Sequence, residues 1–403
     1  MEYLRRLTGR AGMQPAHRPH ISVIRGAALN PFEMQAYVPL QEYFDLKLIG
    51  QRNGSYQSDL IGLPTVLLPS VSAYRSARTA WRLGERVTGQ SLLDSESLWG
   101  LGFAVRRSHI VHSAETFIPL SEQAARICSS STKHLVLTCW ETIPFRSDED
   151  PRIRQRKELV KRACSLFIAV TPRARDALIE EGVDSTRIEV VPAAVDCKRF
   201  NPRNSGDEGR AMLKVTQDQI VALYIGRLIQ EKGIVEMIRA FARASDQRCV
   251  LAIVGSGNQA ERAMYAARGL GIADRIRILP NQSYSDTPKI YAAADVVIAP
   301  SLPTPYWEEQ FGMVLIEAMA SGKALVTTDS GAIPQVVKDA ALLATPYDQE
   351  SLTSHIRHLL GDADARRDLG NRAREFASTT YGIEVIAPRL ADCYRKVMDV
   401  RDA

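Results

Sequence analysis

The sequence has few cysteines, and none of them stand close together. Six occur among 403 residues, with no Cys-x-x-Cys pair. Closely spaced cysteines mark zinc sites and the disulfide frameworks of small secreted domains, so the sequence argues against both. We expect all six to be reduced side chains of the core, and they are Cys128, Cys139, Cys164, Cys197, Cys249 and Cys393.

Long apolar runs are also missing. The longest, such as Ala293–Pro300 and Val221–Ile225, fall well short of the ~20 residues that a membrane-spanning helix needs. The first 19 residues hold four arginines, but no apolar stretch follows that could serve as a secretory signal. We therefore expect a cytoplasmic protein, with the inner face of the membrane as an open alternative.

The excess of positive charge is small. A net charge of +5 is modest for a chain of this length and does not indicate a nucleic-acid partner. It fits anionic small molecules or an anionic membrane surface equally well. Peripheral contact with lipid is conceivable through one basic helix and through Trp81 beside Arg78 and Arg82, although a solvated helix face is the alternative. The cations of that helix are Arg152, Arg154, Arg156, Lys157, Lys161 and Arg162.

Length and hydrophobic pattern predict two α/β domains. A chain of 403 residues exceeds what one core usually fills. From about residue 220, short β-branched runs alternate with amphipathic stretches, which is typical of a parallel sheet covered by helices. The first half repeats the pattern less clearly, and residues 51–108 should form long loops with a short helix or two. We predict Rossmann-like domains over residues 1–200 and 201–383, and a last helix, 384–403, that crosses back to the first domain.

The expected strands follow this division. Those of the first half are His20–Ile24, Leu46–Ile49, His109–His112, Leu135–Thr138, Leu166–Val170 and Ile188–Val191. Those of the second half are Ile220–Ile225, Cys249–Val254, Ile276–Leu279, Val296–Ala299, Ala324–Thr327 and Ala341–Ala344.

A loop rich in glycine and positive charge follows the first strand of the second half. Gly226 and Gly233 allow a ligand to approach the backbone closely. Arg227 and Lys232 add two cations at the carboxyl edge of the sheet, where such folds bind ligands. A diphosphate suits this loop, and the alternative is a surface loop with two solvated charges. The Walker pattern of phosphate-binding loops is absent.

A second glycine loop, Val254 to Ala260, contains Gly255 and Gly257. It resembles a dinucleotide fingerprint, but it follows the second strand of its domain, whereas the fingerprint usually opens the domain. A tight turn that lets the sheet edge approach a ligand is therefore the favoured interpretation.

The strongest signal lies between Pro300 and Gly322. A strand ends at Pro300, a loop carries Glu308 and Glu309, and a helix begins near Gly312 with its free amides directed back at the loop, which suits a phosphate. Glu317 falls about one turn inside that helix among apolar residues, where an unpaired carboxylate is costly, so we expect it to have a partner such as sugar hydroxyls. The alternative is a helix with one exposed acid.

Taken together, these motifs resemble the sugar-nucleotide site of family-four glycosyltransferases with the GT-B fold. The resemblance is close from about residue 165 onward and loose before it. It implies two Rossmann-like domains facing each other across a cleft. It also implies retaining hexosyl transfer from a nucleotide-diphosphate sugar to a glycan, lipid or small-molecule acceptor, with no metal and no further cofactor. The matching stretches run in the family's order and include 226–233, 255–257, 300–301, 309–322 and 330–334.

The resemblance also implies residue roles. Arg227 and Lys232 would hold the diphosphate and Glu309 the hydroxyls of the donor sugar, and these three are the predicted catalytic residues. Glu317 would hold the ribose, and backbone amides from Phe311 to Val314 would complete the phosphate cradle. The predicted substrate-binding residues are Gly26, His112, Trp140, Glu141, Gly226, Gly255, Gly257, Phe311, Gly312, Met313, Val314 and Glu317.

Three departures from the family pattern concern the first domain and one late loop. Trp140 stands where the family often has a histidine that donates to the C6 hydroxyl of the sugar, so Glu141 or His112 would have to substitute. For His112, a hydrogen-bonded structural histidine is the alternative. Gln335 replaces a frequent glutamate, and Ala193-Ala194 a frequent Asn-Gly.

Other functions compete with the transferase. A GT-B epimerase or hydrolase would consume the donor without an acceptor. A non-enzymatic relative would bind the nucleotide sugar only, which the intact Arg227, Lys232, Glu309 and Glu317 oppose. A nicotinamide dehydrogenase is the weakest alternative.

Overall fold

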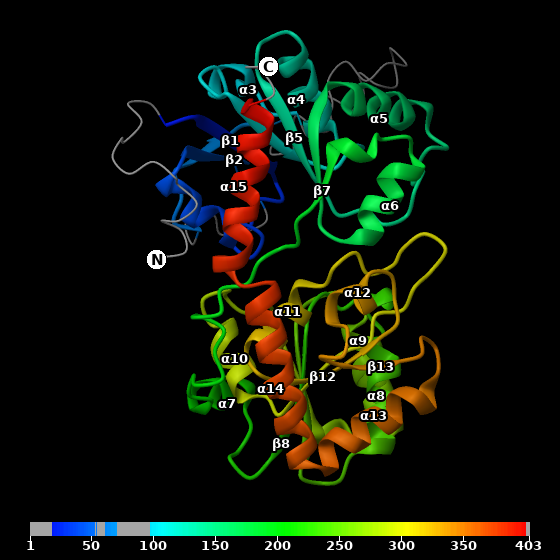
Figure 1. Cartoon of the computed structure of the whole chain (residues 1–403). Coiled ribbons are helices and arrows are strands. Elements are labelled where there is room, and N and C mark those ends of the chain that lie inside the picture. The colour runs from blue at the N-terminus through cyan, green and yellow to red at the C-terminus, as the bar shows by residue number, and fades with distance from the viewer. Residues whose placement is uncertain (1–17, 53, 55–60, 71–96, 400–403) are drawn as a thin grey trace.

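The computed structural model describes residues 18–52, 54, 61–70 and 97–399. Two lobes lie one above the other in Figure 1, each a parallel sheet with helices on its faces. We call them the N-terminal lobe, which holds β1 to β7, and the C-terminal lobe, which holds β8 to β13. This arrangement confirms the predicted pair of Rossmann-like domains. Trp81, Arg78 and Arg82 lie outside the described residues.

The described strands of the N-terminal lobe form one sheet in the order β3-β2-β1-β4-β5-β6-β7. All neighbours pair in parallel. The strands are β1 (His20–Gly26), β2 (Asp45–Gln51), β3 (Thr65–Leu68), β4 (Ile110–Ala114), β5 (His134–Cys139), β6 (Cys164–Ala169) and β7 (Ile188–Val190). The helices, of which those labelled η are 3-10 helices, are η1 (Gln35–Glu42), α3 (Leu101–Ala104), α4 (Pro119–Ser129), α5 (Pro151–Ala163), α6 (Pro172–Glu180) and η4 (Ser185–Arg187).

The C-terminal lobe has the strand order β10-β9-β8-β11-β12-β13, again in parallel. The strands are β8 (Ile220–Ile225), β9 (Cys249–Val254), β10 (Ile276–Leu279), β11 (Val296–Ala299), β12 (Ala324–Thr328) and β13 (Leu342–Ala344). The helices are α7 (Asp207–Leu213), η5 (Gln230–Lys232), α8 (Ile234–Ala244), α9 (Ala260–Gly269), η6 (Ala273–Arg275), α10 (Thr287–Ala293), α11 (Met313–Ala320), α12 (Ile333–Val337), α13 (Gln349–Gly361) and α14 (Ala363–Thr380).

The amphipathic spacing of α8 shows why these helices cover the sheet. Ile234, Met237, Ile238 and Phe241 recur every three or four residues and are buried. They pack into one hydrophobic cluster with alternate residues of β8 and β9. Because successive strand residues point to opposite faces, the other residues of those strands join a second cluster on the far side.

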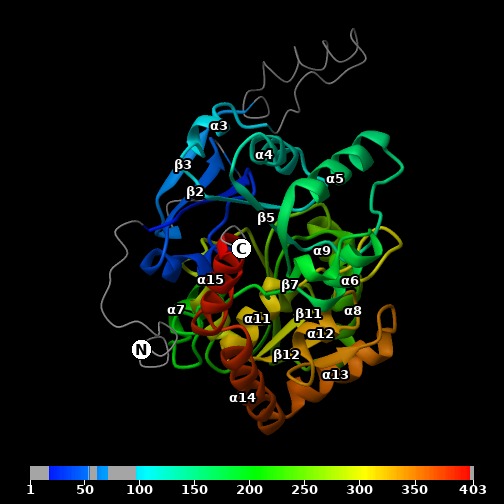
Figure 2. The same ribbon diagram turned by 45° about the horizontal axis from the view of Figure 1, so that its top comes forward.

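The last helix, α15 (Ile383–Asp399), leaves the C-terminal lobe and lies against the N-terminal one in both views (Figures 1 and 2). Its buried Ile386, Leu390 and Tyr394 share a cluster with Ile21 and Val23 of β1. The chain therefore passes between the lobes twice, first through the segment after β7 and then at the start of α15.

One strand was not predicted. We expected loops and a short helix or two over 51–108, and in the described part of that stretch α3 is such a helix. Thr65–Leu68, however, forms β3 at the edge of the sheet beside β2. Val66 and Leu67 are exposed, so the strand lacks the apolar alternation that identifies a half-buried strand from sequence. The six cysteines are buried and unpaired, as expected.

Candidate active site

The strand order reverses beside β1 in one lobe and beside β8 in the other, and folds of this kind bind ligands at the carboxyl edge of the sheet next to such a reversal. Loops from these edges touch each other across the space between the lobes. Gln310, after β11, donates to Glu141, after β5, and Arg173, after β6, pairs with Glu308. The two carboxyl edges therefore face each other.

The two glycine loops pack directly on one another. The amide of Leu228 donates to Ser256 O at 2.9 Å, and that of Gly226 to Val254 O at 3.0 Å. A Cβ at Gly255 would lie 1.9 Å from Gly226 O, so no larger residue fits there. The glycines thus build the sheet edge, and they leave Arg227 exposed on it.

Lys232 and Glu309 form a hydrogen-bonded ion pair in the centre of this edge. Ser301 Oγ donates to the same carboxylate at 2.7 Å, and Lys232 Nζ lies 5.0 Å from the ring centre of Trp307. Burial works to raise the pKa of Glu309, but the charge and hydrogen bond of Lys232, with Ser301 and the charge of Arg227, hold it below its ordinary value. The structure thus brings all three predicted catalytic residues together.

Helix α11 starts beside this pair. Its N-cap is Gly312, with φ of 82°, and no side chain caps the first turn. The amides of Gly312, Met313 and Val314 therefore stand at the positive end of the helix, ahead of the first intrahelical bond, in which Leu315 N donates to Gly312 O at 2.9 Å. Phe311 is buried beneath them, so its ring supports the turn and only its backbone can face a ligand.

Glu317 has protein partners in place of the sugar hydroxyls we expected. Its carboxylate accepts hydrogen bonds from Tyr284 Oη at 2.9 Å and from Tyr291 Oη at 3.2 Å. Burial raises its pKa to about 7, against the lowering effect of these bonds and of Arg199. Since Tyr284 follows β10 at the sheet edge and is only half-buried, a ribose at this edge would meet the tyrosine and Glu317 as one unit.

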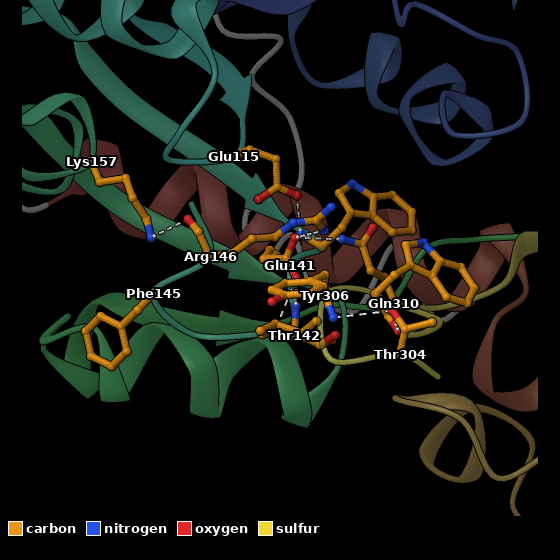
Figure 3. A network of polar contacts seen from close by, with 12 residues as sticks. Glu115, Glu141, Thr142, Phe145, Arg146, Lys157, Thr304, Tyr306 and Gln310 are labelled. Carbon is orange, nitrogen blue, oxygen red and sulfur yellow. Dashed lines mark hydrogen bonds and ion pairs between the residues drawn. The ribbon is translucent and has the colours of Figure 1, made fainter. Parts of the chain in front are cut away.

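The N-terminal lobe contributes Glu115, Trp140 and Glu141. Figure 3 shows Glu115 and Glu141 on the side of this lobe, with Gln310 of the other lobe bonded to Glu141. Trp140 N donates to Glu115 Oε1 at 2.7 Å, and the indole meets the Phe311 ring edge-on at 5.8 Å. Burial raises the pKa of Glu115 to about 8. Glu115, which we did not predict, also holds a left-handed φ of 59° directly after β4.

Glu141 is fully engaged by the protein. Its Oε1 accepts from the amides of Thr142 and Ile143, both at 3.0 Å. Its Oε2 accepts from Arg146 at 2.6 Å and Gln310 at 3.2 Å. These four donors fill the acceptor sites of a carboxylate, so Glu141 fixes the cleft wall and the contact between the lobes.

The structure does not fit the prediction of His112 as one of the two substitutes for the missing histidine. Its side chain is fully buried in the strand, with Nδ1 2.7 Å from Tyr394 Oη and Nε2 2.8 Å from Thr138 Oγ1. Burial, with the charge of Arg25, lowers its pKa well below the ordinary value. His112 is the hydrogen-bonded structural histidine of our alternative. Gly26, with φ of 55°, is buried at the end of β1. A Cβ added at this position would lie 3.0 Å from the side chain of Leu120.

The basic helix α5 is less open than its sequence suggests. Lys157 is buried and pairs with Asp148 at 2.8 Å and Glu181 at 2.6 Å. Arg156 pairs with Glu122 at 3.0 Å. The exposed cations of the helix are Arg152, Arg154 and Arg162. Of the six cations predicted along this helix, these three are exposed, while Arg156, Lys157 and Lys161 pair with acids within the lobe.

Comparisons with known proteins agree with this geometry. Residues 207–376 match the family "Glycosyl transferases group 1", and residues 66–199 match "Glycosyltransferase Family 4". Both halves thus match the same class in the order that the two lobes have in the chain. The chain belongs to the GT-B glycosyltransferases of family 4.

Curated relatives cover the chain in part. It is 32% identical to the D-inositol 3-phosphate glycosyltransferase of Salinispora tropica over 251 residues. The aligned stretch covers 58% of this chain and 51% of that protein. It is 30% identical over 244 residues to the lipopolysaccharide 1,2-N-acetylglucosaminetransferase of Salmonella typhimurium, 58% of this chain and 62% of that protein. The chain thus spans only about half to three fifths of these relatives' length.

Solved structures share the fold along nearly the whole chain. Anabaena Alr3699/HepE in complex with UDP and glucose superposes with a TM-score of 0.74, at 19% identity over 94% of this chain and 100% of that one. Sucrose-phosphate synthase from Thermosynechococcus elongatus superposes with a TM-score of 0.69, at 19% identity over 95% of this chain and 100% of that one. Within the described residues, no helix is both long and apolar enough to cross a bilayer.

Proposed function

We propose that this chain is a retaining glycosyltransferase that takes a sugar from a nucleoside-diphosphate donor. The observation that carries the proposal is the meeting of three features at one sheet edge. They are the exposed Arg227, the Lys232–Glu309 pair and the uncapped first turn of α11. Cations and helix amides suit a diphosphate, and a carboxylate beside them suits the hydroxyls of the attached sugar.

The same groups would favour bond cleavage. As the bond between the anomeric carbon and the phosphate breaks, negative charge grows on the departing diphosphate. Fixed positive charge from Arg227, Lys232 and the α11 amides stabilises that charge more in the transition state than in the ground state. The departing phosphate oxygen can accept the proton of the acceptor hydroxyl on the same face. Such a reaction retains the anomeric configuration and requires no side-chain base.

Glu317 and Tyr284 are proposed to hold the ribose. Ribose hydroxyls can donate to the Glu317 carboxylate while Tyr284 Oη shifts to accept from one of them. We propose UDP as the first nucleotide to test, because the superposable HepE was solved with UDP. The acceptor is proposed only as a hydroxyl-bearing glycan, lipid or small molecule, since the named relatives act on inositol phosphate and on lipopolysaccharide.

We also propose that the protein works in the cytoplasm and touches the inner face of the membrane only peripherally. The three exposed cations of α5 support a weak attraction to anionic lipid. Flotation with vesicles of phosphatidylcholine alone and with phosphatidylglycerol tests this. Equal recovery with both vesicles would contradict it.

The decisive experiment offers UDP-, GDP- and ADP-sugars to the full chain and measures the free nucleoside diphosphate, with and without inositol phosphates and glycans as acceptors. We expect release with one nucleotide class, stimulated by an acceptor and lost in Glu309→Gln. Failure to consume any donor would contradict the proposal. Acceptor-independent release, or an isomerised donor, would identify the hydrolase or epimerase alternative.

A further inference from the structure

Three consecutive residues of the loop after β11 bind alternately to the two lobes. Glu309 binds Lys232 in its own lobe. Its neighbours on either side bind the N-terminal lobe: Glu308 pairs with Arg173, and Gln310 Nε2 donates to Glu141 Oε2 at 3.2 Å. The central carboxylate is therefore held between two contacts that exist only while the lobes are together.

The contact at Glu308 is the more directional of the two. Arg173 Nε lies 2.5 Å from Oε1 and Nη2 lies 2.7 Å from Oε2 of the same carboxylate, so the guanidinium and carboxylate meet as a fork. A two-point contact of this kind fixes orientation as well as distance. Glu308 keeps only 11% of its side chain exposed, against 46% for Arg173.

Helix α6 presents Arg173 for this contact. Thr171 caps the helix, accepting from Ala174 N at 3.1 Å, and Pro172 occupies the first turn. The amide of Arg173 is one of the first-turn amides that have no intrahelical acceptor, and it donates to Gln335 Oε1 at 3.0 Å. Backbone and side chain of one residue thus reach two points of the C-terminal lobe.

Those two points flank the backbone of Glu309. Gln335 lies on α12, and the turn before α12 supports the loop, because Ala332 N donates to Glu309 O at 2.8 Å. A Cβ at Gly331 would lie 2.3 Å from Glu309 O, so the two segments touch at backbone level. A shift of Arg173 would therefore act on Glu309 from both sides.

We propose that Arg173 is a positioning residue of the donor site. It holds Glu309 in place through Glu308 and Gln335, and it does so only when the lobes are closed, so closure and recognition of the donor sugar depend on the same loop. The proposal rests on the proposed function for Glu309. In this proposal Arg173 acts through these protein partners and not by direct contact with the donor.

The test uses Arg173→Ala in the full chain, with Arg175→Ala as the matched control. Arg175 lies on the same helix and is exposed, and its side chain makes no hydrogen bond or ion pair within the described part of the chain. We expect Arg173→Ala to lower kcat for the donor about tenfold or more, since small misplacements of a positioning group are costly, with KM changed much less. Because Arg173→Ala leaves the nearly buried Glu308 without its partner, some loss of stability is expected, and kcat is compared at a temperature where both variants are fully folded.

A charge exchange separates positioning from general damage. Arg173→Glu alone should be worse than Arg173→Ala, and adding Glu308→Arg should recover most of the lost kcat. Turnover of Arg173→Ala within about twofold of the control, or no recovery in the double variant, overturns the proposal.

Hydrogen exchange gives a readout that is independent of turnover. With UDP as the probe, peptides covering 303–311 should gain protection in the wild type and in Arg175→Ala, but much less in Arg173→Ala. Equal protection in all three overturns the coupling even if donor is turned over. Protection that depends on Arg173 in a protein that consumes no donor would support the coupling and reject the proposed function instead.

Discussion

Replacing Glu317 by glutamine should remove a loss of folding stability that grows as the pH rises. Burial raises the pKa of Glu317 from 4.5 to about 7. Between these values the unfolded chain has ionised this carboxyl while the folded chain keeps its proton, so the unfolded state gains stability. The contribution of Glu317 to the free energy of unfolding is therefore fully present below pH 4.5, and it is lost as the pH rises through about 7.

The magnitude follows from the shift. At 1.36 kcal/mol per pH unit, a rise from 4.5 to about 7 corresponds to about 3 kcal/mol of stability lost above pH 7. Glutamine is neutral at every pH and keeps one acceptor oxygen for Tyr284 or Tyr291, at the cost of about 1 kcal/mol for the second bond. Relative to wild type, Glu317→Gln should be no more stable at pH 5 and about 2 kcal/mol more stable at pH 8.

Urea unfolding of both proteins at pH 5, 6.5 and 8 measures this difference. Glu309→Gln serves as the control of opposite sign, because the pKa of Glu309 is lowered. Its stabilising contribution is present above the unfolded pKa of 4.5 and is lost only as the pH falls through the lower folded pKa, so the glutamine variant should be destabilised by about the same amount at all three pH values. Parallel curves for wild type and Glu317→Gln from pH 5 to 8 would refute the reasoning.

The same variants separate the proposed ligand roles in calorimetry with free UDP. Glu317→Gln should weaken UDP binding by about 1–3 kcal/mol, because the ribose loses a charged acceptor. Glu309→Gln should bind UDP nearly as the wild type does while turnover falls, because Glu309 contacts the sugar only. The reverse result would show that the two roles are exchanged.

Three further outcomes are expected. Lys232→Ala should lower turnover roughly 30- to 1,000-fold, which corresponds to about 2–4 kcal/mol of transition-state stabilisation. Arg239→Ala, which removes an exposed cation, should change turnover little, and equal effects of the two variants would reject the Lys232 assignment. His112→Ala should cost about 2–4 kcal/mol in urea unfolding with KM for the donor unchanged, whereas a kinetic defect at wild-type stability would return His112 to the active site. Trp140→His should improve UDP-glucose relative to UDP-xylose, which lacks the exocyclic hydroxymethyl group, and an unchanged ratio would place the sugar elsewhere.

The sequence allows the parts of the C-terminal half of the candidate site to be placed together because these parts are local. A strand end, a glycine loop and a helix start each occupy fewer than ten residues, and a parallel sheet brings such strand ends to one edge. Arg227, Lys232 and Glu309 could therefore be assigned to one site. The strands of both sheets were predicted for the same reason, with β3 as the exception at an edge that is not buried.

The parts that could not be predicted depend on contacts between distant segments. Tyr394 lies 282 residues from His112 and occupies its Nδ1, so no local pattern reveals that the histidine is unavailable. Tyr284 and Tyr291, which account for the buried Glu317, come from a loop and a helix 33 and 26 residues earlier. Arg173 and Glu308 are 135 residues apart. For Arg173 a weak signal exists, because a threonine cap and Pro172 at a helix start place it at the sheet edge.

The Lys232–Glu309 pair links these observations to the proposed reaction. Two cations and an uncapped helix end gathered at one edge would repel each other unless an anion stood among them, and Glu309 supplies that anion within the protein. A diphosphate brings more negative charge than one carboxylate, so it can take over Lys232 and leave Glu309 to the hydroxyls of the sugar. That exchange removes the main influence that lowers the pKa of Glu309. In our proposal, the flanking bonds to Arg173 and Glu141 then keep the released carboxylate in place, so that turnover depends on the closed lobes.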